Sequence, residues 1–293
     1  MRPSFINSMI FFAMFCLTGS DVFAEHDKNY FRAPSPSPFV SPGFEKGDLD
    51  AMVTGGLVFV STKNDDLFGA DAGVKGRYAF DDTIAVDGGA GFAMLGGKSE
   101  PGLLPRGDLS AYTVLAGSDG TVFSTLYRMN LDVEVQLYNS SRFGLIFFIG
   151  PNFNLFYFRR VSDYSVVSTY PLSNKYTDRQ NSVSVIGGFQ SGLAFNIPLK
   201  NDITLCPVFM IAPFMGIKHI HDNTGRSGIP SSSSTIDVPS TTTVSFGMNV
   251  KWRKLSFSPL VQVMQLSSEN SSRKDQVWSM AFTVGYYFFS NKM

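Results

Sequence analysis

Apolar and polar residues alternate along most of this chain, from about residue 50 to residue 289. The last such stretch, "VWSMAFTVGYYFF", places large apolar side chains at every second position from Trp278 to Phe288 and mostly small or polar ones between them. A period of two predicts a β-strand with two unlike faces. Comparable stretches recur along the chain and predict an all-β protein with strands at 50–62, 68–80, 84–95, 122–138, 143–158, 183–197, 203–217, 243–253, 255–266 and 277–289.

Short and long connections alternate between these strands. The short ones are "DDT", "NSSR", "PLKND" and the single residue Lys254. The longer, polar ones are residues 96–121, 159–182, 218–242 and 267–276, and only the first connection on that side, residues 63–67, is brief. Alternation of tight turns with long loops is typical of a barrel that crosses a membrane, with the turns at one end and the loops at the other.

Strand length indicates which face meets hydrocarbon. Most of the predicted strands have ten or more residues, whereas strands of soluble proteins usually have about five or six. A tilted strand needs about 9 to 11 residues to cross a bilayer. We therefore predict a single closed antiparallel transmembrane β-barrel of about ten strands, with a secreted soluble all-β domain as the alternative. Eight or twelve strands remain possible, because "AYTVLAG" (111–117) and "YSVVSTY" (164–170) can extend hairpins beyond the membrane.

The first 48 residues differ from the rest of the chain. Arg2, an apolar run of about a dozen residues and the pattern Val22-x-Ala24 predict a signal peptide over residues 1–24. Residues 25–48 are rich in Pro and Ser, without apolar periodicity, which predicts an extended periplasmic tail. The barrel is then expected over residues 49–293. No stretch offers the roughly 18 uninterrupted apolar residues of a transmembrane helix.

Composition removes several classes of function. Lys and Arg number 24 and Asp and Glu also number 24, so the balanced charge gives no case for nucleic acid as a partner. Cys206 is the only cysteine after residue 24, which leaves no internal disulfide and no structural zinc cluster. P-loop, nucleophile-elbow and HExxH motifs are absent. We expect no cofactor and no metal.

Two short motifs carry a resemblance to a known class. "FTVGYYF" (282–288) looks like the aromatic-ended final strand that the barrel assembly machinery reads, and "FFIGPNFN" (147–154) also resembles strands of that class. Over about residues 49–289 the chain resembles bacterial outer-membrane β-barrels, in particular the small OmpA-like and opacity-type class. The resemblance implies a Gram-negative outer-membrane location, contact with outer-membrane lipid and assembly through the final strand.

Charged residues recur on the face that would point into the barrel, in the half of each strand nearest the short turns. A ten-stranded barrel is narrow, so side chains fill much of its interior. Opposite charges there are expected to pair, because an unpaired buried charge costs several kcal/mol. The expected lumen charge network, a salt-bridge plug or alternatively the lining of a narrow water-filled pore, comprises Lys75, Arg77, Asp87, Asp132, Glu134, Lys251 and Arg253.

Aromatic residues gather near the predicted turns. Their rings suit the headgroup level of a membrane, with strand propensity as the simpler explanation. The expected girdle comprises Tyr78, Phe80, Tyr138, Phe143, Trp252, Phe257, Tyr286 and Phe288. On the other side, the Ser/Thr-rich "SGIPSSSSTIDVPSTTT" (227–243) is expected to be a mobile surface loop.

An enzymatic role has one candidate. Omptin surface proteases resemble this chain in length and strand count, and they need an Asp two residues before a His, facing acidic residues across a cleft. Here His219, His221 and Asp222 lie near the start of a long loop, Glu100 and Asp108 lie in another, and Ile217 stands where that Asp would be for His219. We therefore expect a non-enzymatic structural, surface-exposed or adhesion-type protein, with a narrow pore or an omptin-like protease as alternatives.

Overall fold

The computed structural model describes residues 43–61, 65–99, 103–105, 114–117, 120–167, 175–223, 232–266 and 275–290. The predicted signal peptide and most of the predicted tail lie outside these ranges. No helix in the described ranges is long and apolar enough to cross a membrane. The strands are β1 (Leu49–Ser61), β2 (Asp65–Ala79), β3 (Ile84–Ser99), β4 (Leu103–Pro105), β5 (Val114–Gly117), β6 (Gly120–Asn139), β7 (Gly144–Val167), β8 (Lys175–Pro198), β9 (Ile203–Asn223), β10 (Ser232–Trp252), β11 (Leu255–Leu266) and β12 (Asp275–Ser290).

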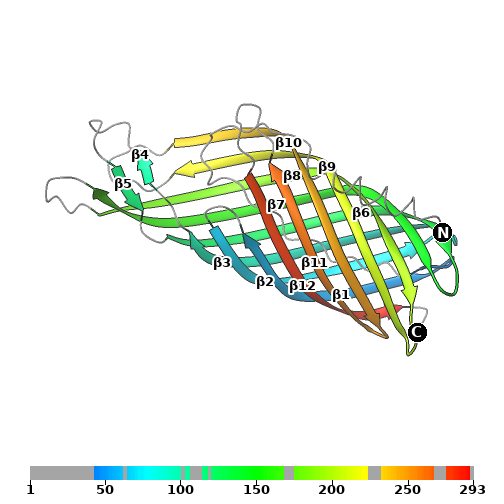
Figure 1. The fold of residues 1–293 in the computed structure, drawn as a ribbon. Helices are drawn as coiled ribbons and strands as arrows, with labels where there is room; N and C mark the ends of the chain where they lie inside the picture. The colour runs from blue at the N-terminus through cyan, green and yellow to red at the C-terminus, as the bar shows by residue number, and fades with distance from the viewer. Residues whose placement is uncertain are drawn as a thin grey trace, which may run out of the picture.

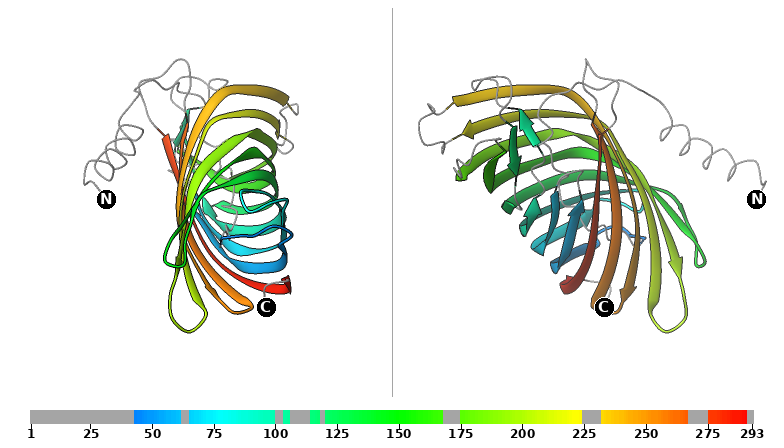
Figure 2. Two further views of the ribbon diagram at one scale, coloured as in Figure 1. Left: turned by 90° about the vertical axis from the view of Figure 1, so that its right-hand side faces the viewer. Right: turned by 60° about the vertical axis from the view of Figure 1, so that its left-hand side comes forward.

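The ten long strands close into one antiparallel barrel (Figures 1 and 2). Each pairs with the next long strand along the chain, and β12 returns to pair with β1, where Val60 lies opposite Ser279. Closure leaves the wall of the barrel without a free edge, so its backbone donors and acceptors are paired within the protein. The predicted closed antiparallel barrel of ten strands is confirmed, and β4 and β5 form a short additional hairpin.

The two ends of the barrel carry different connections. At the end that we name the turn end, strands are joined by residues 80–83, 140–143, 199–202 and 253–254, and β1 begins and β12 finishes there. Asn201, Asp202 and Arg253 have positive φ values of 63°, 60° and 52°, as tight turns between antiparallel strands often require. The opposite end, named the loop end, carries the other connections.

The strands β7, β8, β9 and β10 run further toward the loop end than their sequences predict. They contain 24, 24, 21 and 21 residues, so much of the regions expected as loops, 159–182 and 218–242, is strand. The Ser/Thr-rich stretch expected to be a loop is part of β10 from Ser232 onward, because it pairs with β9 up to Asn223. Backbone pairing of this kind leaves no trace in an apolar periodicity.

The short hairpin joins this extension. Val114–Gly117 of β5 pairs with Tyr164–Val167 of β7, so the two segments that could extend hairpins beyond the membrane do pair with each other. Figure 1 shows β5 and the end of β7 reaching past the ends of β1, β2 and β3.

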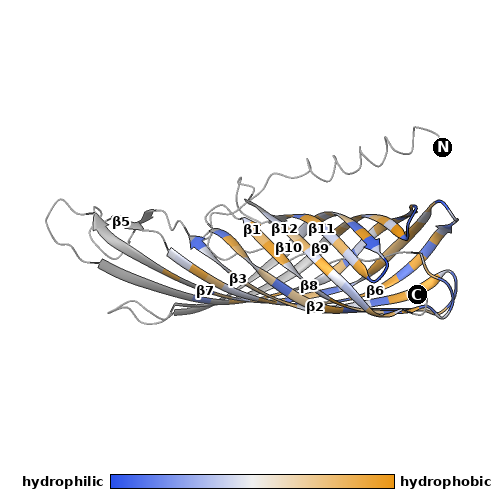
Figure 3. Ribbon diagram, turned by 90° about the horizontal axis from the view of Figure 1, so that it is seen from below, coloured by the Kyte–Doolittle hydropathy of each residue, from blue (hydrophilic) through white to orange (hydrophobic). Residues whose placement is uncertain are grey.

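Large apolar side chains cover the outside of the barrel. Figure 3 shows the alternation of hydrophobic and hydrophilic residues along its strands. On β12 the outward residues from Trp278 to Phe288 are 41–58% exposed, while the alternate residues Ser279, Ala281 and Thr283 are almost completely buried. The expected orientation of this strand is therefore correct. The expected girdle residues Tyr78, Phe80, Tyr138, Trp252, Phe257, Tyr286 and Phe288 are all exposed, and Phe143 is half-buried.

The interior is filled in three levels along the barrel. Nearest the turn end is a group that we name the turn-end cluster: Phe44, Ala79, Ala85, Ile146, Phe148, Ala194, Val208 and Met210. Charged residues follow, named the ionic layer: Asp50, Lys75, Arg77, Asp87, Asp132 and Glu134. Toward the loop end lies the apolar layer: Val58, Val60, Leu67, Ala93, Leu95, Val122, Leu126, Phe156, Phe158 and Ala281.

Candidate functional site: the charged interior of the barrel

The ionic layer is assembled from four neighbouring strands. Alternation along β2 turns Lys75 and Arg77 inward, and the same period turns Asp87 of β3 and Asp132 of β6 inward beside them. All the members of the layer are at most 9% exposed. Five of the seven residues expected in a lumen charge network, Lys75, Arg77, Asp87, Asp132 and Glu134, thus lie together inside the barrel.

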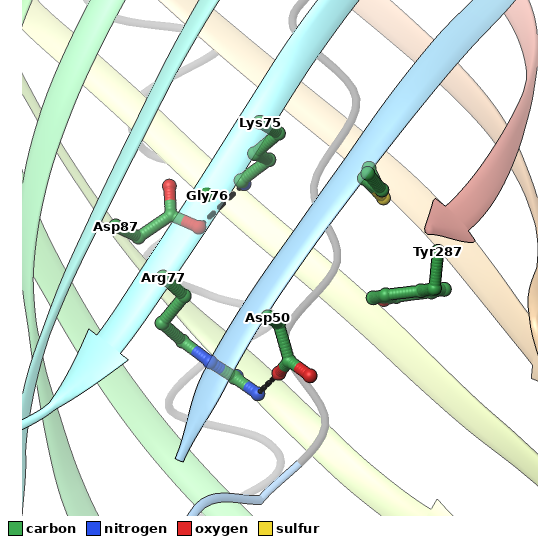
Figure 4. Close-up of a pocket in the computed structure, with 7 residues that line it drawn as sticks. Asp50, Lys75, Gly76, Arg77, Asp87 and Tyr287 are labelled. Atoms are coloured by element: carbon green, nitrogen blue, oxygen red, sulfur yellow. Dashed lines mark hydrogen bonds and ion pairs between the residues drawn. The ribbon is translucent and has the colours of Figure 1, made fainter. Parts of the chain in front are cut away.

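Arg77 lies at the centre of the part of this layer that is nearest the turn end (Figure 4). Its Nη2 lies 2.5 Å from Asp50 Oδ2, and its Nη1 lies 3.7 Å from Glu134 Oε2. The guanidinium carbon also lies 5.6 Å from the centroid of the Phe44 ring. One fixed cation therefore compensates two buried carboxylates, which a planar guanidinium with five N–H donors suits well.

Lys75 and Asp132 continue the layer toward the loop end. Lys75 Nζ lies 3.0 Å from Asp87 Oδ2. Asp87 and Asp132 are directly opposite each other in the pairing of β3 with β6, which places two carboxylates side by side. Amides help to hold the second of these carboxylates, because Gln190 Nε2 donates to both of its oxygens at 2.9 Å and Asn130 Nδ2 donates at 2.6 Å.

One further buried ion pair was not predicted from the sequence. Arg128 Nη2 lies 2.5 Å from Asp71 Oδ2, and both side chains are almost completely buried. A Cβ at Gly91 would lie 2.5 Å from Arg128 Nε, so the glycine gives the guanidinium room to lie against β3. Asp71 lies on the same inward face of β2 as Lys75, and Arg128 lies on the same inward face of β6 as Asp132. The alternation along these two strands could therefore have predicted that both charges point inward.

The two remaining members of the expected network have different positions. Lys251 is half-buried, with its Nζ 4.3 Å from the centroid of the Tyr287 ring. Arg253 does not face the interior: it is exposed in the turn after β10 and lies 3.5 Å from Asp202. The expectation for Arg253 is corrected because β10 ends at Trp252. The alternation that assigned an inward face stops there, and the chain turns back.

A cavity opens within the ionic layer, lined by Asp50, Met52, Lys75, Gly76, Arg77, Asp87 and Tyr287 (Figure 4). Asp87 Oδ1 and the Tyr287 hydroxyl have no hydrogen-bond partner among the described residues. The inward position of Tyr287 was not predicted. It lies in the run "YYFF", where the neighbouring Tyr286 and Phe288 are also aromatic, so the hydropathy pattern does not separate the two faces there. In the described ranges no three His, Cys, Asp or Glu residues are arranged to hold a metal.

Two histidines of the omptin comparison lie on a strand that contributes nothing to the ionic layer. His219 and His221 stand near the loop end of β9, where the backbone pairs with Ser184 and Ser182 of β8. Glu100 and Asp108 lie outside the described residues, as does the arrangement of the histidine side chains.

Comparison with known proteins supports the fold. No family model matches the chain, and no curated protein matches it. The outer membrane protease OmpT from Escherichia coli overlays with a TM-score of 0.57 at 10% identity, covering 82% of this chain and 97% of that one. A major outer membrane protein from Thermus thermophilus gives 0.35 at 14% identity, covering 82% and 99%. The translocator domain of the autotransporter NalP from Neisseria meningitidis gives 0.42 at 10% identity, covering 82% and 88%.

Of these three proteins, OmpT alone exceeds a TM-score of 0.5, and at 10% identity the likeness is one of fold. Together with the closed ten-stranded wall and its apolar exterior, the overlay shows that the chain has the fold of a bacterial outer-membrane β-barrel.

Proposed function

We propose that the protein is an integral outer-membrane β-barrel with a filled, non-conducting interior and a structural or adhesion-type role at the cell surface. The turn end faces the periplasm and the loop end faces the exterior. The proposal includes export by the signal peptide, and it assigns no enzymatic activity.

The apolar exterior supports the membrane location. Large apolar side chains that are 41% exposed or more occur on most of the ten long strands, including Val53, Phe68, Met129 and Phe246. A soluble monomer rarely shows an apolar patch of more than a few hundred Å². An apolar belt around a closed barrel is what a lipid environment stabilises.

The filling of the interior is the single observation that carries the non-conducting role. Buried ion pairs occupy the lumen near the turn end, and the apolar layer occupies the lumen toward the loop end with residues at most 4% exposed. An apolar constriction opposes water and ions even where it is not completely closed. A narrow pore is the main alternative. It would require the side chains of both the ionic layer and the apolar layer to move away from the barrel axis.

The extension at the loop end supports the surface role. The strands β7, β8, β9 and β10 continue pairing beyond the neighbouring strands, and the β4–β5 hairpin pairs onto β7 there. A paired sheet that rises from a closed barrel offers a surface for contact with a neighbouring molecule.

Conductance in planar lipid bilayers tests the proposal. The refolded protein should give no stable single-channel steps, and an Arg253→Leu variant should behave in the same way because its side chain lies outside the interior. Large, stable steps from the wild-type protein would replace the proposed role with that of a pore.

Assembly through the final strand is a further part of the proposal. The outward rings Tyr286 and Phe288 close the chain's last strand, as the assembly machinery would require. Replacing Phe288 by Ala should lower the amount of heat-modifiable barrel in cells more than Phe246→Ala, a matched outward ring on β10. Equal loss in both variants would leave the final strand without a special role.

The protease alternative has its own test. Cleavage of a basic peptide by the refolded barrel, lost on His221→Ala, would overturn the non-enzymatic part of the proposal. Absence of cleavage under conditions where the protein migrates as a folded barrel is the expected result.

A further inference from the structure

The residue Phe44 is completely buried, although it precedes the barrel and follows a Pro/Ser-rich stretch. The sequence predicts that it belongs to the periplasmic tail. Its ring instead belongs to the turn-end cluster, together with Ile146, Phe148 and Met210 from the inner faces of β7 and β9. A ring from the connecting segment therefore fills the base of the lumen.

Hydrogen bonds fix the backbone around this ring. The Phe44 N–H donates to Gln136 Oε1 at 3.1 Å, and Gln136 Nε2 donates to the Phe44 carbonyl at 3.1 Å and to the Asp82 carbonyl at 2.7 Å. The Lys46 N–H donates to Asp82 Oδ1 at 2.7 Å, and the Gly47 N–H donates to the Ala79 carbonyl at 2.9 Å. Gly47, with φ of 81°, then redirects the chain toward β1.

We propose that residues 43–48 form a stopper that closes the turn end of the barrel, and that the turn-end cluster is its socket. This device goes beyond the proposed function, because it is a second seal below the ionic layer and does not depend on that layer being closed. The segment is not a strand of the closed sheet, although Gly47 and Asp48 exchange backbone hydrogen bonds with Ala79 of β2 where β1 begins. Its release would therefore loosen only the end of one strand pairing, whereas release of any wall strand would open the barrel.

The contact between the stopper and the ionic layer supports this assignment. The Arg77 guanidinium, which pairs with Asp50 and Glu134, also faces the Phe44 ring at 5.6 Å. A cation at this distance from an aromatic ring is attracted to its face. The position of the ring is thus linked to the main cation of the interior.

Cys206 is a built-in reporter of the socket. It is completely buried on the inner face of β9, and its Sγ lies 3.9 Å from Asn196 Oδ1. Asn196 also borders the stopper, because a Cβ at Gly43 would lie 2.8 Å from Asn196 Nδ2. A reagent that enters from the turn end would reach this thiol only after the stopper has moved.

The experiment measures how fast a small, water-soluble maleimide labels Cys206 in protein refolded without residues 1–24, so that no other cysteine is present. In the Phe44→Ala variant the rate should rise about tenfold or more, because the segment opens more often once its ring is lost. The matched control Lys46→Ala lies in the same segment with an exposed side chain, and its rate should remain that of the wild type. A variant without residues 25–46 should be labelled at least as fast as Phe44→Ala.

Folding of each variant is checked by heat-modifiable migration. Wild-type labelling rates in both folded Phe44→Ala and the shortened chain would overturn the stopper. Failure of both variants to fold would also overturn it, since the segment would then be part of the wall and not a separate closing element. Neither outcome depends on conductance, so the stopper and the non-conducting role succeed or fail separately.

Discussion

The half of the barrel interior nearest the turn end (the lower half) and the half nearest the loop end (the upper half) are formed by the same strands but contain different kinds of side chain. Along β6, Glu134, Asp132 and Arg128 give way to Leu126 and Val122 toward the loop end. The lower half holds buried ion pairs above the turn-end cluster. The upper half packs apolar side chains against one another, with small or amide side chains such as Ser124, Gln262 and Ser279 buried beside them. The lumen is thus filled in two ways. Near the turn end the filling depends on each charged side chain keeping its ion-pair partner, and toward the loop end it depends on close packing of apolar side chains.

This difference sets how each half responds to damage. Removing one member of a buried ion pair leaves the other without compensation, whereas removing an apolar side chain leaves a cavity. The two kinds of loss can be measured with urea unfolding of the refolded barrel, in the order of their expected size.

The largest effect is expected from Arg77→Leu in the lower half. Asp50 and Glu134 would lose their shared guanidinium, which should lower the free energy of unfolding by ~3–5 kcal/mol. A loss below 1 kcal/mol would show that water already compensates these carboxylates, and the ionic layer would then be a hydrated lining instead of a seal.

The boundary between the halves gives the next test. Arg128→Met alone leaves the buried Asp71 without its cationic partner and should lower the free energy of unfolding by ~3–5 kcal/mol. The double variant Asp71→Leu with Arg128→Met should recover most of that stability. Recovery would show that the apolar layer can extend downward by one level. A double variant that is no more stable than Arg128→Met would mean that this pair serves more than mutual compensation.

The upper half should lose less on average. Leu126→Ala removes a completely buried side chain and should cost ~2–5 kcal/mol, according to how far the cavity collapses. Because no charge is involved, the loss should be the same at low and high salt. A marked dependence on salt would contradict a dry apolar layer.

The smallest effect is expected outside the interior. Arg253→Leu breaks the pair with Asp202, whose two side chains are 71% and 70% exposed, and should change stability by less than ~1 kcal/mol. A loss as large as that of Arg77→Leu would contradict the placement of Arg253 in the turn.

Alternation with a period of two, together with strand length and the alternation of short and long connections, predicted the closed barrel and the inward charges from Lys75 to Glu134. It failed where periodicity carries no information. Val58 and Val60 point inward although they are apolar, so both faces of β1 look alike in sequence. Phe44 lies before the first strand, and only the folded turn end shows that its ring has a socket.

The orientation of the exterior is the claim on which all else depends, and the two tryptophans test it directly. Trp252 lies at the turn end of β10, Trp278 lies near the loop end of β12, and both are about half exposed on the outer wall. In vesicles that contain lipids brominated high on the acyl chain, the fluorescence of both should be quenched strongly, and iodide in the water should quench it weakly. Strong quenching by iodide without any by the brominated lipid would contradict a lipid-facing exterior.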